Sequence, residues 1–69
     1  MVRVKWDREE EKFLIKDPER GLRFWAVADS PRAVVRLRKL WEEVADALYP
    51  KRVNYLKVRR EWITLIPIE

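Results

Sequence analysis

The chain has 69 residues, a formal net charge of +4 and a sequence pI of about 9.8, and 41% of its residues are charged. This length allows one domain with one hydrophobic core, and the absence of cysteine and histidine excludes disulfides and Cys/His metal sites. The usual general base and thiol nucleophile are therefore missing, and a single glycine cannot form a phosphate-binding loop. We expect a single domain over residues 1–69 that is not an enzyme and has no catalytic residues, metal site, cofactor or small-molecule substrate.

Uncharged polar residues are rare in this chain. Asn54, Ser30 and Thr64 are each alone of their type, glutamine is absent, and charged residues take their place. Heat-adapted proteins show this exchange, so we expect a thermophilic source. The first strand-like segments carry charges throughout and no apolar run is long enough to cross a membrane, so we expect no signal peptide, no membrane contact and a cytoplasmic location.

The first half of the chain predicts three strands. Apolar and charged residues alternate over residues 2–6 and again over residues 12–16, with the period of two that is typical of half-buried strands. The sequence Asp-Pro-Glu-Arg-Gly at 17–21 predicts a hairpin turn, because the proline presets φ, the aspartate can cap the turn and the glycine tolerates positive φ. Residues 22–28 are apolar on both faces, which indicates a central strand.

One amphipathic helix is expected over residues 30–49. Ser30 can cap its first N–H groups, Pro31 suits the first helical position, and Tyr49-Pro50 ends it. Its apolar stripe, which we expect in the core, consists of Val34, Leu37, Trp41, Val44 and Leu48, widened by Leu40 and Ala45.

The remaining residues, 53–68, are strand-like on both faces. No Gly, Asn or Asp stands between Val58 and Glu61 to form a tight turn, so we expect one long strand, bulged at Arg59-Arg60 and ending at Pro67. The predicted fold is α+β, a small, mostly antiparallel sheet of about four strands with one helix packed on one face, in the order β-β-β-α-β.

Alternation also sorts the charges. If the apolar positions face the helix (Val2, Val4, Trp6, Phe13, Ile15, Phe24 and Ala26), the opposite sheet face is almost free of acids and carries Arg3, Lys5, Lys12, Lys16, Arg23 and Trp25. One of the two phases of the last strand adds Tyr55, Lys57 and Arg59 to this face. Like charges on neighbouring strands repel, so such a face is costly unless an anion lies on it.

The helix carries a second charge pattern. Its first half holds Arg32, Arg36, Arg38 and Lys39 and its second half holds Glu42, Glu43 and Asp46, which is the reverse of what the helix dipole prefers. Cations at a positive helix end favour a bound anion. The alternative is pairing within the helix, of Arg38 with Glu42 and of Lys39 with Glu43.

These patterns predict a small basic nucleic-acid-binding module, for RNA or a ribonucleoprotein, in which cations hold phosphates and aromatic rings stack on bases. The candidate binding residues are Arg3, Lys5, Lys16, Arg23, Trp25, Arg32, Arg36, Lys39, Tyr55, Lys57 and Arg59. The alternative is a protein-binding module (adaptor, inhibitor or homodimer) with an apolar surface formed by Trp25, Val35, Ile63, Ile66 and Ile68. A third interpretation is a merely solvated face, since Lys and Arg on strands discourage aggregation.

Overall fold

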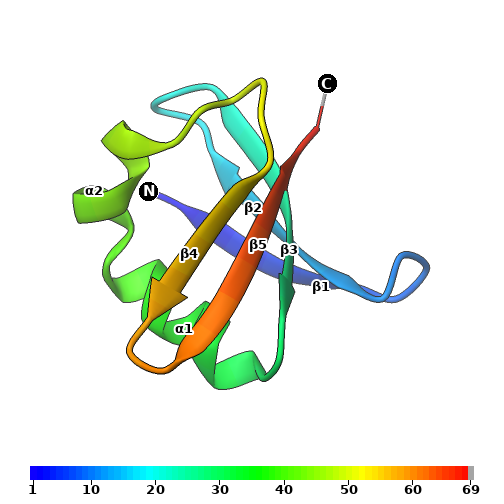
Figure 1. Cartoon of the computed structure of the whole chain (residues 1–69). Helices are drawn as coiled ribbons and strands as arrows, with labels where there is room; N and C mark the ends of the chain where they lie inside the picture. The colour runs from blue at the N-terminus through cyan, green and yellow to red at the C-terminus, as the bar shows by residue number, and fades with distance from the viewer. Residues whose placement is uncertain (69) are drawn as a thin grey trace.

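The computed structural model describes residues 1–68 and consists of one antiparallel sheet with a helical segment on its inner face (Figure 1). The strands are β1 (Arg3–Asp7), β2 (Lys12–Asp17), β3 (Leu22–Ala28), β4 (Asn54–Val58) and β5 (Glu61–Pro67). The helices are α1 (Pro31–Lys39), α2 (Trp41–Val44) and the short 3-10 helix η1 (Ala45–Ala47). The sheet order is β1-β2-β3-β5-β4, so β3 is central as predicted. The predicted α+β class is confirmed, with five strands in place of about four.

The C-terminal segment forms a hairpin, and the prediction of one long strand was wrong. Val58 pairs with Glu61, so Arg59 and Arg60 alone form the turn, and Arg59 takes a left-handed conformation with φ of 59°. That conformation costs a residue with a Cβ roughly 1–2 kcal/mol. Two-residue turns therefore usually contain Gly, Asn or Asp, and because none of these stands here the sequence showed no turn signal. The ladder of β5 with both β3 and β4 offsets this cost.

The helix is also interrupted, at Leu40, which has φ of −98° and ψ of 6°. Leu40 is consequently 40% exposed and is not the core residue that we expected, whereas Trp41 is buried on the far side of the break. Nothing in the local sequence signals this break. It places Trp41 against Asp17, the last residue of β2, a contact between segments far apart in the chain.

Ser30 stands at the helix start but does not cap it through its side chain. Its backbone is extended and its hydroxyl donates a hydrogen bond to Glu61 Oε1 at 2.8 Å. The predicted cap was therefore wrong, because a carboxylate of β5 competes for the same hydroxyl.

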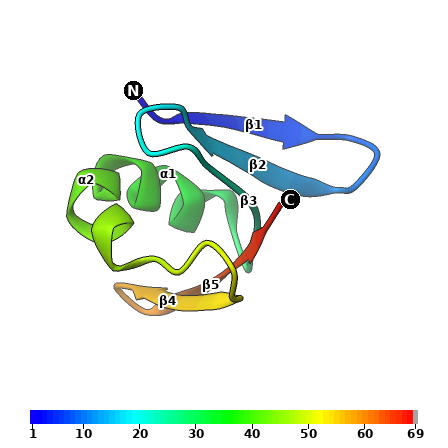
Figure 2. The same cartoon turned by 90° about the horizontal axis from the view of Figure 1, so that it is seen from above.

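The core lies between the concave face of the sheet and the helices. Seen from above, the sheet bends so that β1–β2 and β4–β5 lie on opposite sides of the helical segment, with β3 between them (Figure 2). Phe24 meets Trp41 edge to face at 6.4 Å between ring centroids. Trp6 points inward as predicted but is 48% exposed, because the β1–β2 hairpin extends beyond the helices.

Asp17 joins the β2–β3 turn to the helical segment. Its carboxylate is 1% exposed and accepts hydrogen bonds from Trp41 Nε1 at 2.7 Å, from the Arg20 guanidinium at 3.0 Å and from the Arg20 backbone N–H at 3.2 Å. Arg20 in turn contacts Glu42 at 2.9 Å and Asp46 at 3.1 Å. Burial raises the pKa of Asp17, but the hydrogen bonds from Trp41 and Arg20 outweigh it, so the pKa lies below its ordinary value of 3.8.

Because the folded-state pKa of Asp17 is depressed, its contribution to stability is present above the unfolded-state pKa and is lost as the pH falls through the folded-state value. We expect the free energy of unfolding to decrease below about pH 4, and Asp17→Asn to remove about 2 kcal/mol at neutral pH and to flatten this pH dependence. Urea unfolding followed by tryptophan fluorescence measures both effects. The matched variant Asp46→Asn, whose side chain is 80% exposed, should change stability little. Equal losses in the two variants would contradict the assigned role of Asp17.

The left-handed conformation of Arg59 allows a second test of stability. Arg59→Gly should raise the free energy of unfolding by roughly 0.5–1 kcal/mol, because glycine adopts positive φ without a steric penalty. Arg60, in the same turn, lies outside the left-handed region, so Arg60→Gly should lower stability. Thermal unfolding of both variants tests the assignment, and a stabilised Arg60→Gly would argue against it.

Candidate nucleic-acid interface

The outer face of the sheet, away from the helices, brings most of the predicted binding residues together. Arg3 lies opposite Lys16, and Lys16 lies opposite Arg23, so three cations from adjacent strands form one row, the cation row. The next row contains Lys5, Leu14, Trp25 and Ile66. Beyond it, Tyr55 lies opposite Thr64 and Lys57 lies opposite Trp62. The phase left open by the sequence is therefore the one that puts Tyr55 and Lys57 on the face of Trp25.

The cation row has no internal charge compensation. Its three side chains are exposed, and within residues 1–68 none of them lies at ion-pair distance from a carboxylate. The nearest acids along the chain are engaged elsewhere, Asp17 in the core and Glu19 with the terminal amine at 2.8 Å. Directly opposite residues on neighbouring strands stand about 4.5–5.5 Å apart at Cβ, so the cations repel one another.

Two shallow hollows flank Lys16 on this face. One, of about 530 Å³, is lined by Arg3, Lys5, Asp7, Leu14 and Lys16 together with Val4, and the other, of about 250 Å³, lies between Lys16 and Arg23 over the β2–β3 turn. The single carboxylate in the first hollow, that of Asp7, accepts the backbone N–H groups of Glu9 and Glu10. Anionic groups of a ligand can therefore approach Lys16 from both sides.

Exposed aromatic rings follow the cation row on the same face. Tyr55 is 70% exposed and Trp62 is 55% exposed, while Trp25 is partly buried between its neighbours. We call Trp25, Tyr55 and Trp62 the aromatic strip. Lys57 Nζ lies 5.7 Å from the centroid of the Trp62 ring, within cation–π range. Trp62 was not among the residues predicted from the sequence, because only the hairpin turn at Arg59 puts it on the same face as Lys57.

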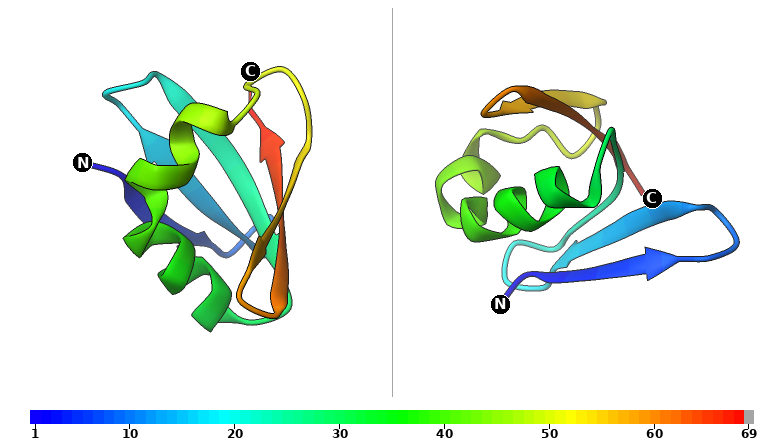
Figure 3. Two further views of the ribbon diagram at one scale, coloured as in Figure 1. Left: turned by 60° about the vertical axis from the view of Figure 1, so that its left-hand side comes forward. Right: turned by 90° about the horizontal axis from the view of Figure 1, so that it is seen from below.

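The outer face is convex, as Figures 2 and 3 show from two directions. The cation row belongs to the β1–β3 part and most of the aromatic strip to the β5–β4 part, on the other side of the bend. A ligand that uses both must curve over β3. A duplex is stiff over this length, whereas a single strand follows such a bend readily.

The helix cations lie on the other side of the sheet, and their charge pattern has a simple explanation. Because α1 ends at Lys39, three of the cations (Arg36, Arg38 and Lys39) occupy its last turn, and Glu42 and Glu43 occupy the first turn of α2. Both arrangements agree with the helix dipole. The prediction of a single long helix with Arg36 and Lys39 near its N-terminus was therefore wrong, and of the three helix cations predicted to bind, Arg32 alone lies in the first turn of α1.

The expected intrahelical pairs are also missing from residues 1–68, because the break at Leu40 separates their partners: Glu42 contacts Arg20, and Arg36 lies 3.7 Å from Glu61. Arg59 sits in the β4–β5 turn and not on the sheet face. Ile63, expected at an apolar interface, is fully buried in the core.

No family model matches this chain, and no curated protein or solved structure is similar enough to count as a relative. In the part of the chain that the structure describes, no helix has the length and apolarity needed to cross a bilayer. The same residues contain no group of three or more acidic side chains placed to hold a metal ion.

Proposed function

We propose that this chain is a non-catalytic nucleic-acid-binding domain that holds a single strand, RNA in preference to DNA, on the outer face of its sheet. The observation that carries the proposal is the uncompensated cation row on the same face as the aromatic strip. Lysine and arginine neutralise phosphates, and flat exposed rings stack on bases of any identity. RNA is favoured because its loops and ends offer unstacked bases for such stacking.

The face suits weak sequence discrimination. Base edges are read by hydrogen-bonding side chains such as Asn, Gln and Ser, and Thr64 is the one uncharged hydroxyl or amide side chain on this face besides the Tyr55 phenol. Tyr55 and Trp62 are one strand and one row apart, about 8 Å at the backbone, which leaves room for one base on each ring. Affinity would come from charge and stacking, with little contribution from base identity.

A protein-binding module or homodimer is the second candidate, favoured by the half-exposed Val27 and Trp62 on the same face. Such an interface would bury the neighbouring cations, and burying a charge without a partner is costly. A partner with a purely apolar surface would therefore bind poorly here. A mass above one chain in light scattering, with salt-tolerant association, would favour this candidate over nucleic-acid binding.

Charge reversal in the cation row tests the phosphate contacts. Arg23→Glu should weaken binding to labelled oligouridine about tenfold or more, measured by fluorescence anisotropy. The logarithm of the wild-type binding constant should fall against the logarithm of salt concentration with a slope of about −2, since each single-strand phosphate contact contributes roughly −0.7. For Arg23→Glu this slope should be less steep by roughly 0.7, the contribution of one phosphate contact.

The matched control is Arg32→Glu, an exposed arginine at the start of α1, on the opposite side of the sheet. Its effect should stay within about twofold, because only screened long-range charge connects it to the outer face. Similar losses for Arg23→Glu and Arg32→Glu would reduce the interaction to net charge and contradict the assigned face.

The two tyrosines give a matched test of stacking. Tyr55→Ala should weaken oligouridine binding by about 1–3 kcal/mol, the usual contribution of one base–aromatic stack. Tyr49 is 64% exposed but lies in the loop before β4, so it should not contribute to oligouridine binding. Tyr49→Ala should therefore bind oligouridine as the wild type does. Both variants should fold normally, and unchanged binding by Tyr55→Ala would exclude the aromatic strip.

A further inference from the structure

The free edge of β1 is a second exposed feature, separate from the outer face. Within residues 1–68, β1 pairs with β2 alone, so its other side presents unpaired backbone N–H and C=O groups. The helix α1 packs mainly on β3, β4 and β5, and no strand pairs with this edge within residues 1–68. Figure 3 shows the helical segment in the opening between β1 and β4.

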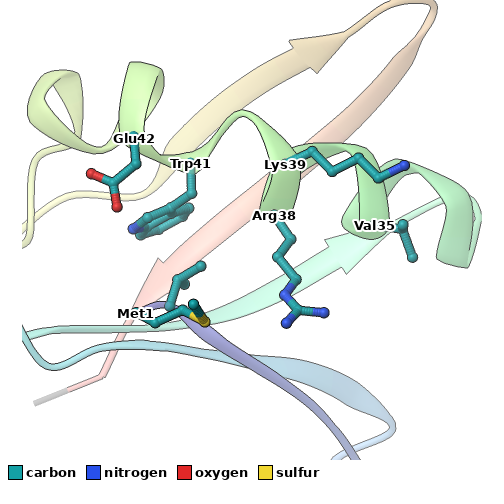
Figure 4. Close-up of a pocket in the computed structure, with 7 residues that line it drawn as sticks. Met1, Val35, Arg38, Lys39, Trp41 and Glu42 are labelled. Atoms are coloured by element: carbon teal, nitrogen blue, oxygen red, sulfur yellow. The ribbon is translucent and has the colours of Figure 1, made fainter.

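An apolar groove runs beside this edge. A hollow of about 360 Å³ is lined by Val2, Val35 and Trp41 among others. Figure 4 shows Arg38 and Lys39 on the helix side of this hollow. Val35 is 54% exposed although it is a large apolar residue. Further along β1, the half-exposed Trp6 lines a separate hollow of about 180 Å³ with Pro31, one helical turn from Val35; the acids Glu11 and Asp29 also line that hollow.

Positive charge predominates where the groove runs between β1 and α1. Arg3 and Arg38 line a common hollow of about 390 Å³ at the edge, and Lys39 extends along the groove (Figure 4). In the part of the chain that the structure describes, none of these three cations has an ion-pair partner. Glu42 is the one acid among the described residues that line this hollow, and Arg20 holds it at 2.9 Å. The edge therefore offers backbone hydrogen bonds, apolar contacts and positive charge together.

We propose that the β1 edge binds an extended acidic segment of a partner protein, which adds a sixth strand to the sheet. Backbone hydrogen bonds to the edge would hold the segment. Alternate side chains would fall on opposite faces, apolar ones toward Trp6 and Val35 and acidic ones toward Arg3, Lys5 and Arg38, which shares a hollow with Arg3. A second copy of this chain fits poorly, because pairing through β1 would bring Arg3 and Lys5 close to their own counterparts.

The test uses a blocked synthetic peptide of about eight alternating Glu and Val residues, a length typical of strands. Amide resonances of residues 3–7 should shift on titration and become protected from hydrogen exchange. Arg38→Glu combined with Lys39→Glu should weaken the peptide about tenfold, and the matched pair Lys51→Glu with Arg52→Glu, exposed in the loop before β4, should not. A Glu-Val peptide should not bind when it is N-methylated at the alternate residues whose backbone N–H groups would pair with β1, because methylation removes those donors.

Binding of a Lys-Val peptide as tight as that of the Glu-Val peptide, or equal losses in the two double variants, would overturn the proposal. So would undiminished binding of the N-methylated peptide. The two sites share Arg3 and Lys5, and variants of residues that belong to one site alone distinguish them: Arg23→Glu and Tyr55→Ala should bind the acidic peptide normally, and Arg38→Glu with Lys39→Glu should bind oligouridine normally. Each site can therefore fail alone.

Discussion

The carboxylate of Asp17 is held in the core by the Trp41 indole and by Arg20, and the arrangement of the sheet against the helices depends on that contact. Because Asp17 ends β2 with its side chain inward, alternation turns Lys16 outward and brings it beside Arg3 and Arg23. A shift of one residue in this strand would bury the lysine and expose Ile15. The same interaction thus stabilises the fold and orients the cation row.

Cations that are stabilised by carboxylates or by a helix dipole lie in a different part of the molecule from those that are not. The guanidinium of Arg20 is surrounded by three carboxylates, which raise its pKa, and the cations at the end of α1 lie where the helix dipole favours them. On the outer face the repulsion between neighbouring strands is relieved by nothing within residues 1–68. The strand β1 contributes to both proposed surfaces, with its cations on one face and its apolar residues and free edge toward the groove.

Four of the six residues of the cation row and the aromatic strip could be predicted from alternation alone. Arg3, Lys16, Arg23 and Trp25 belong to consecutive strands joined by short turns, so a period of two suffices to place them on one face. Trp62 was missed, since its side of the sheet depends on a turn that the sequence does not announce. The helix cations were included for a reason that disappears once α1 ends at Lys39.

By itself the sequence determined the three N-terminal strands, the turn at 17–21 and the apolar stripe of the helix, because period, turn chemistry and proline placement act within a few residues. Tertiary structure alone decided the break at Leu40, the hairpin at Arg59 and the bend of the sheet. Each of these depends on pairing or packing between distant segments. Such contacts outweigh a local preference of about 1 kcal/mol, and local patterns hold no record of them.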